Sequence, residues 1–335
     1  MSSCSLSIGI VGLPNVGKST LFNALTKKAV PAENYPFCTI DPSVGIVPVP
    51  DTRLGRLSEF SKSAKTIPAV VEFVDIAGLV KGASEGEGLG NKFLQNIREV
   101  DAILEMVRVF EDPDIIHVHN EINPLSDIEV INYELILADA ETVTKRLGNL
   151  QKDVKALRKE AVPEEEMLKR VDAYLKTGKL AGTLSFDEKE LPMVKQLNLL
   201  TMKPILYALN TSEATTNKKE MYVKIPGMYV EVDPVFEKGL DDLIKKSYEL
   251  LNLITYFTTG EDETRAWTIQ RGSTAPVAGM AIHTDFRDKF IRAEVVHCDD
   301  LLSSGSYASA REKGLVRTEG KEYVVKDGDV IEFRI

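Results

Sequence analysis

Short apolar runs alternate along the chain with segments whose apolar residues recur every three or four positions, a pattern typical of α/β proteins with a mainly parallel sheet. The runs predict buried strands at Leu6–Val11, Ala69–Asp75, Val100–Phe110, Pro204–Leu209 and Gly227–Val232. A helix is expected to begin near Leu21, directly after the first strand, and another over Leu240–Leu253.

The pattern changes at Asp127. Apolar residues between Ile136 and Leu157 recur at intervals of three and four among charged residues, which makes a narrow stripe like that of a coiled coil. Ala161–Pro163 should break this helix, and a shorter stripe follows at Leu168, Val171 and Leu175. We expect an antiparallel helical hairpin over residues 127–198 that projects from the domain before it, because a helix packed flat on a core would carry a wider apolar face.

From about residue 254 the chain reads as a small α+β domain. Strand-like runs at Arg265–Arg271, Phe290–His297, Glu322–Val325 and Val330–Arg334 alternate with turns, and a short helix is expected at Tyr307–Lys313. This part carries no catalytic constellation, so it is either a structural appendage or a docking module. The predicted domains are therefore residues 1–126 with 199–253, the insertion 127–198, and residues 254–335.

Composition narrows the class of protein. The 335 residues are 43% hydrophobic and 27% charged, as in ordinary globular chains of two or three domains. No apolar run approaches the ~20 residues of a membrane span, the first five residues lack the features of a secretory signal, and three scattered cysteines indicate a reducing compartment. We expect a cytoplasmic protein without membrane attachment. The net charge of −10 argues against indiscriminate nucleic-acid binding, and no specific DNA target is expected.

The stretch Gly12–Thr20 carries the clearest chemistry, because it fits the phosphate-binding pattern G-x-x-x-x-G-K-[ST] between a predicted strand and a predicted helix. Glycines at both ends let the backbone curl so that its N–H groups face phosphate oxygens, and the helix adds its positive end. Lys18 should reach the β- and γ-phosphates, and the Ser19 hydroxyl should ligate Mg²⁺. The nucleotide-binding residues expected here are Asn15, Val16, Gly17, Lys18, Ser19 and Thr20.

Two later segments complete the expected Mg²⁺ and γ-phosphate site. Thr39 lies in a proline-rich loop at the place where switch proteins use a threonine to complete the Mg²⁺ shell, although it could be a simple turn residue. The run that ends at Asp75 continues into D-x-x-G, so Asp75 should hold Mg²⁺ through water and the Gly78 N–H should meet the γ-phosphate.

The residue after Gly78 is Leu79, where Ras-type GTPases place the glutamine that orients water. Hydrolysis must then depend on another group. His117, in the loop after the strand at Val100–Phe110, could orient water or offset charge, or it could be structural. We expect Lys18 and His117 to be the catalytic residues.

Base recognition is expected at Asn210–Glu213, where GTPases carry N-K-x-D. Thr211 replaces the lysine, and Glu213 replaces the aspartate that binds guanine. The Asn210 amide can pair with adenine N7 and its 6-amino group. We therefore predict a preference for ATP, with Glu213 turned away from the base; a polar turn without specificity is the alternative.

Together these residues resemble the YchF/Obg-like ATPase family of translation-factor-related P-loop proteins, over nearly the whole chain. The stretches that carry the resemblance are residues 12–20, 34–40, 75–93, 134–139, 265–269, 282–286 and 327–333. The resemblance implies an Obg-type P-loop domain with a mainly parallel sheet, the inserted hairpin, and a C-terminal TGS domain of β-grasp fold.

The same resemblance implies an Mg²⁺-dependent, slow ATPase in which a histidine at the position of His117 substitutes for the glutamine. It implies a K⁺ ion near Asn15, redox sensitivity at Cys38, and association with the ribosome or its large subunit through the hairpin and the TGS domain. One departure is Glu231–Pro234, which lacks the Ser-Ala signature of the second base contact. An Obg-type GTPase and a non-hydrolysing ATP-binding switch remain the alternatives.

Overall fold

The computed structural model describes residues 6–30, 41, 43–76, 91–110, 122–155, 161–212 and 222–335. The chain divides into two compact units. One comprises Met1–Leu6, Leu25–Phe73 and Leu240–Ile335, and the other comprises Ser7–Ala24 and Val74–Gly239. We call them the C-terminal unit and the loop unit, because the first contains the end of the chain and the second contains the phosphate-binding loop.

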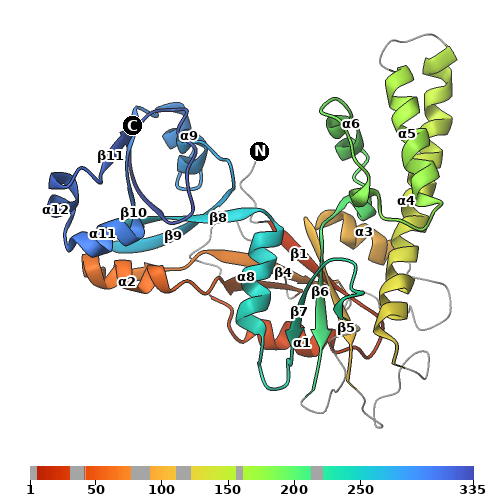
Figure 1. Cartoon of the computed structure of the whole chain (residues 1–335), viewed down its shortest axis with the longest axis horizontal. Coiled ribbons are helices and arrows are strands. Elements are labelled where there is room, and N and C mark those ends of the chain that lie inside the picture. Colours follow the sequence, from red (N-terminus) through yellow and green to blue (C-terminus); the bar gives the residue numbers. More distant parts are fainter. Residues whose placement is uncertain are drawn as a thin grey trace. The chain divides into compact units, whose positions relative to one another are not determined.

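The loop unit is built on parallel strands, as the apolar runs predicted (Figure 1). Their order is β1-β5-β6-β7, and the end of β4 (Val70–Asp75) lies beside β1. Every residue of β5 is buried, which explains why this strand reads as a nearly continuous apolar run. The strands are β1 (Ser7–Val11), β5 (Ala102–Arg108), β6 (Ile205–Asn210) and β7 (Met228–Val232), and the helices beside them are α1 (Lys18–Thr26) and α3 (Asn91–Glu99).

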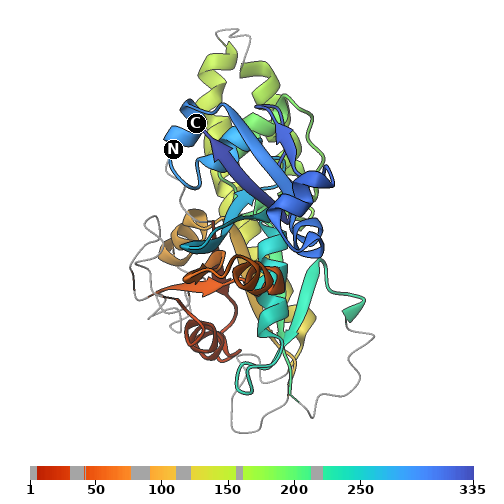
Figure 2. The same cartoon turned by 90° about the vertical axis from the view of Figure 1, so that its left-hand side faces the viewer.

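The predicted helical hairpin is present in the loop unit, where α4 (Pro124–Lys155) and α5 (Ala161–Leu175) run side by side (Figure 1). Figure 2 shows the same pair from a second direction. The distal half of α4 buries its apolar stripe against α5, whereas Ile128 near its start packs against Val107 and Leu209 of the sheet. The long helix α4 therefore packs on the sheet near its start and projects from it farther along, where it packs against α5.

Pro163 does not break a helix but starts one. It lies in the first turn of α5, where the N–H that proline lacks would have no helical partner. The hairpin is fastened to the chain that follows it by Asp139, a buried residue of α4. Its carboxylate accepts hydrogen bonds from the Leu200 and Thr201 backbone N–H groups at 2.9 and 2.7 Å. These lie in η5 (Leu200–Met202), which follows η4 (Ala181–Thr183) and α6 (Glu190–Gln196).

The C-terminal unit contains a six-stranded sheet in the order β11-β10-β12-β8-β9-β3. Its core includes the buried Tyr256, whose hydroxyl donates to the Ala278 carbonyl at 3.0 Å. The strands are β3 (Lys65–Ile67), β8 (Leu253–Thr259), β9 (Glu263–Gln270), β10 (Arg292–His297), β11 (Arg317–Glu319) and β12 (Asp329–Arg334). The short helices are α9 (Ala275–Gly279), α10 (Asp285–Asp288), α11 (Cys298–Ser304) and α12 (Tyr307–Glu312).

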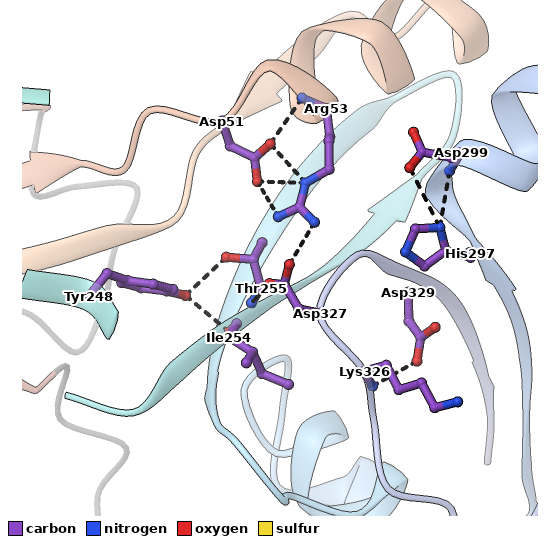
Figure 3. Close-up of polar contacts among 10 residues, drawn as sticks. All are labelled: Asp51, Arg53, Tyr248, Ile254, Thr255, His297, Asp299, Lys326, Asp327 and Asp329. Carbon is purple, nitrogen blue, oxygen red and sulfur yellow. Dashed lines mark hydrogen bonds and ion pairs between the residues drawn. The ribbon is translucent and has the colours of Figure 1, made fainter. Parts of the chain in front are cut away.

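Arg53 joins parts of the C-terminal unit that are distant in sequence (Figure 3). It lies in α2 (Thr52–Ser61), where the helix-capping carboxylate of Asp51 binds its guanidinium through both oxygens. The same guanidinium donates to Asp327 at 2.7 Å, and Asp327 also accepts from the Thr255 N–H at 2.9 Å. This network fastens α2 to β8 and to the turn before β12. In the same figure, His297 accepts from the Asp299 N–H and so caps α11.

Two predicted elements differ from the observed ones. The helix α8 begins at Leu240 as expected but ends at Leu250, and Asn252 with φ 55° turns the chain into β8, which the sequence did not reveal. No strand covers residues 322–325 in the described chain; Val324 forms an isolated bridge with Thr274. The segment is apolar because the side chains of Tyr323 and Val325 pack against the core of the unit.

Residues 43–67 contain β2 (Val44–Pro48), α2 and β3, none of which was predicted. β3 pairs in parallel with β9, with Thr66 opposite Thr264, so a strand from the first quarter of the chain forms the edge of the C-terminal sheet. Residues 25–73 and 240–335 therefore belong to one compact unit. The limits proposed from sequence instead place residues 25–73 and 240–253 in one domain and residues 254–335 in another. Those limits stay a prediction. Within the described residues, no helix combines the length and apolar character of a membrane span.

Candidate functional site

The turn between β1 and α1 has the backbone that the phosphate-binding pattern requires. Gly12 has φ 147° and Gly17 has φ 101°, both in the region that side chains disfavour. A methyl group on Gly12 would lie 2.5 Å from the Met106 carbonyl oxygen, and one on Gly17 would lie 2.5 Å from Nδ2 of Asn210. Both glycines are therefore required by conformation and by close approach.

The first turn of α1 offers accessible groups beside this curl. The helix begins at Lys18, and the Leu21 N–H donates to the Gly17 carbonyl at 2.9 Å. Ser19 and Thr20 are exposed, whereas Val16 is buried and anchors the loop in the core. Asn15 is exposed and has φ 62°, a conformation that asparagine tolerates better than most residues. A helix N-terminus with the exposed hydroxyl residues Ser19 and Thr20 is suited to bind an anion and its metal ion.

Lys18 is held within the loop. Its Nζ donates to the Leu13 carbonyl at 2.5 Å. Burial, partly offset by the negative charge of Asp75, lowers the pKa of Lys18 to about 8. Asp75 ends β4 and is itself 9% exposed. The structure thus brings Lys18 and Asp75 together, as expected, and leaves a cation that an arriving phosphate would stabilise.

Asn210 ends β6 and turns toward the loop. Its Nδ2 donates to the Val16 carbonyl at 2.9 Å, so this predicted base-reading residue also fixes the phosphate-binding loop. Nδ2 carries a second hydrogen, and Oδ1 can accept, so the amide retains the two groups that pairing with adenine uses. Thr211 follows, and its N–H donates to the Val232 carbonyl at 2.9 Å.

Several predicted site residues lie outside the described residues. They are Thr39, Gly78, His117 and Glu213, together with Cys38. Their roles in Mg²⁺ binding, γ-phosphate contact, water placement and base choice stay predictions. Among the described residues, the predicted phosphate-binding loop lies beside Asp75 and Asn210.

Two features were missed by sequence reasoning, which are Met106 behind the phosphate-binding loop and the exposed apolar side chain of Phe236. Met106 of β5 backs both loop glycines, with its Cε 3.4 Å from a methyl group placed on Gly17. Phe236 is 67% exposed in the loop after β7, whose ends are bridged between Asp233 and Lys238. No local pattern marks Met106, but the apolar Val235 and Phe236 in a loop that lacks the Ser-Ala signature were a signal that could have been weighed.

Comparisons with known proteins bear on the family and the fold of this chain. Residues 7–141 match the family model described as 50S ribosome-binding GTPase, and residues 253–335 match the C-terminal domain model of YchF GTPases, described as a protein of unknown function. The chain is 51% identical to the Bacillus subtilis (strain 168) protein named ribosome-binding ATPase YchF, over 98% of this chain and 99% of that protein. It is 46% identical to the Escherichia coli O157:H7 protein of the same name, over 97% and 98%.

A solved structure extends the comparison to the fold. The structure titled as the Schizosaccharomyces pombe YchF GTPase superposes with a TM-score of 0.88 at 37% identity, over 100% of this chain and 99% of that one. The match covers the P-loop GTPase-type domain, the helical insertion and the C-terminal domain alike. Full-length identity near one half, both family models and the shared fold lead to one conclusion: this chain belongs to the YchF family.

Proposed function

We propose that this protein is a cytoplasmic, ribosome-associated P-loop ATPase that hydrolyses ATP to ADP and phosphate and acts as a nucleotide-dependent switch. The observation that carries the proposal is the loop geometry, in which two positive-φ glycines and a buried lysine shape a cradle for a polyphosphate. The names of the full-length relatives, ribosome-binding ATPase, support the same assignment.

The phosphate chemistry falls to residues of the loop. In this proposal Lys18 leaves the Leu13 carbonyl and pairs with the β- and γ-phosphates. Lys18 thereby offsets the charge that develops on the transferred group. Nitrogen donors of the loop backbone and the N-terminus of α1 hold the remaining phosphate oxygens.

The residues present fit Mg²⁺. Ser19 offers an exposed hydroxyl in the first turn of α1, and Asp75 offers a carboxylate near Lys18, which are the oxygen donors that this ion prefers. Ser19 would ligate the ion directly and Asp75 through water, with Thr39 as the predicted third member. When bound, Mg²⁺ would neutralise charge between the β- and γ-phosphates. A K⁺ ion beside the exposed Asn15 is a further part of the proposal, taken from the family resemblance.

Slow intrinsic turnover is expected from the residue that stands where Ras-type GTPases orient the attacking water. Leu79 cannot hydrogen-bond a water molecule, so no side chain is fixed in advance at the position of the Ras glutamine. We retain His117 as the residue that helps to place the attacking water. A partner that places His117 against the attacking water would raise turnover.

Selection of ATP over GTP rests on Asn210, Thr211 and Glu213. The Asn210 amide keeps a donor hydrogen and an acceptor oxygen for adenine while it holds the loop. Because one solved relative is titled a GTPase and the curated relatives are named ATPases, base choice needs its own measurement.

Ribosome contact is assigned to the helical hairpin and the C-terminal domain. The hairpin offers an exposed apolar pair on α4, Tyr133 and Leu137, four residues apart on one face of the helix. This pair gives a surface on which the partner assignment can be tested.

The test combines competition with turnover. Unlabelled ATP and GTP compete for one fluorescent nucleotide, and phosphate release is measured with and without purified ribosomal subunits, with Lys18→Ala as the binding control. We expect ATP to compete at lower concentration and turnover to rise with subunits. Stronger competition by GTP would make the protein a GTPase, and negligible turnover with subunits and K⁺ present would make it a non-hydrolysing switch.

A further inference from the structure

Glu105 is a carboxyl group buried in the middle of the loop unit. It lies in β5 with 1% of its surface exposed, and its Oε2 has no hydrogen-bond partner in the described part of the chain. In register it stands opposite Val11 of β1 and Tyr207 of β6. A carboxylate in such a place would be costly, because burial without compensating partners disfavours charge.

The groups around Glu105 favour its neutral form. Burial, and then the charge of Asp127 from the first turn of α4, raise the pKa of Glu105 well above its usual value. From β6, Tyr207 faces the same place; its own pKa is raised by burial and by Glu105, and its hydroxyl is hydrogen-bonded to Asn132 of α4. Among the described residues, Asp127 is the charged group that acts on Glu105.

Of the two carboxyl groups, Asp127 is the better placed to stay ionised. It lies in the first turn of a 32-residue helix, where the helix dipole favours negative charge. Glu105 lies in the middle of a strand and has no such support. Two negative charges buried close together repel each other at a high cost in free energy, so the pair of carboxyl groups shares one proton.

We propose that Glu105 is a positioning residue that carries a proton at neutral pH, and that this neutral carboxyl lets the root of α4 pack against β5 directly behind the phosphate-binding loop. When the proton is lost, charge repulsion between Glu105 and Asp127 loosens this packing. The next residue, Met106, connects the change to the site, since its carbonyl oxygen lies 2.5 Å from a methyl group placed on Gly12.

The sign of the pH dependence follows from linkage. Because the pKa is raised in the folded protein above 4.5, the folded chain keeps a proton that the unfolded chain releases as the pH rises through that value. Stability is therefore lost as the pH rises from about 4.5 toward the raised pKa, by up to about tenfold in the folding constant per pH unit. Glu105→Gln is neutral at every pH and has no such dependence.

The test measures urea unfolding of the full chain from pH 5 to 9 for the wild type, Glu105→Gln and the control Glu129→Gln. Glu129 is exposed on the same helix. We expect the stability of Glu105→Gln relative to the wild type to increase with pH, while Glu129→Gln follows the wild type. Asp127→Asn, which removes the neighbouring charge, should move the wild-type dependence to lower pH.

Parallel curves for Glu105→Gln and the wild type would overturn the proposal. A Glu105→Gln variant that is less stable at every pH would also overturn it if added Mg²⁺, Ca²⁺ or K⁺ stabilised the wild type but not this variant, because the carboxylate would then serve as a cation ligand. If Glu105→Gln does not fold, an unchanged pH dependence in Asp127→Asn is the overturning result. The Mg·ATP affinity of each variant relative to the wild type is a second readout that rests on the proposed function, whereas unfolding does not.

Discussion

The side-chain amide of Asn210 donates to the Val16 carbonyl across 2.9 Å, which joins the end of β6 to the phosphate-binding loop. The two residues are 194 positions apart in the chain. The same amide nitrogen occupies the space that a side chain on Gly17 would need. The residue expected to read the base is therefore joined directly to the loop expected to hold the phosphates.

Asn210→Ala should weaken both stability and nucleotide binding. It leaves the buried Val16 carbonyl without its partner, which costs about 1–3 kcal/mol of folding free energy. Affinity for ATP and for GTP should fall by about tenfold or more, equivalent to about 1.4 kcal/mol. Asn210→Asp, which has no hydrogen to donate, should lose affinity in the same way. A variant with altered ATP-to-GTP preference and unchanged total affinity would restrict Asn210 to base recognition.

Gly17→Ala should abolish nucleotide binding. At φ 101° a side chain costs at least about 1–2 kcal/mol in the backbone alone, and the methyl group would displace the Asn210 amide. Gly55→Ala is the matched control, because Gly55 lies inside α2 with open space around it. That change should be neutral or stabilise by about 0.5–1 kcal/mol. Calorimetry with Mg·ATP checks both, and wild-type affinity in Gly17→Ala would contradict the loop assignment.

Affinity for Mg·ATP should depend on pH through Lys18, whose pKa burial lowers to about 8. The polyphosphate binds the protonated lysine, so binding takes up a proton once the pH exceeds the pKa of the free protein. The association constant should therefore be flat below pH 8 and fall above it by up to about tenfold per unit. Lys18→Arg stays charged and should give a flat profile at whatever affinity it retains. A wild-type constant that is unchanged up to pH 9.5 would contradict this role.

Much of the fold could be predicted because its signals are local. Gly12 and Gly17 mark a turn whose positive φ angles most residue types disfavour. The buried runs before Gly12 and up to Asn210 are short enough to be strands of a parallel sheet. The hairpin was predictable from the narrow stripe that α4 buries against α5. The predicted helix break at Pro163 was wrong, because proline occurs both at helix ends and in the first turn of helices. Pro163 lies in the first turn of α5.

What could not be predicted depends on partners distant in sequence. β3 is three residues long and becomes a strand by pairing with β9, about 200 residues later. Arg53 carries no motif, and its place is set by Asp327 from the other end of the chain. Likewise, no pattern at Asn210 announces a bond to Val16 or a methionine behind Gly17. Contacts between residues distant in sequence determine these features, and local sequence propensity does not indicate such contacts.

The exposed pair on α4 gives the last prediction. Tyr133 and Leu137 are 60% and 51% exposed and adjacent on the helix face, so most of their apolar surface faces solvent and is suited to a partner. Tyr133→Ala with Leu137→Ala should leave folding and Mg·ATP affinity unchanged, since alanine favours helix. Co-sedimentation with ribosomal subunits should fall several-fold. Leu191→Ala, at an exposed leucine of α6, is the matched control. Equal sedimentation of all three proteins would move the ribosome contact away from this face of the hairpin.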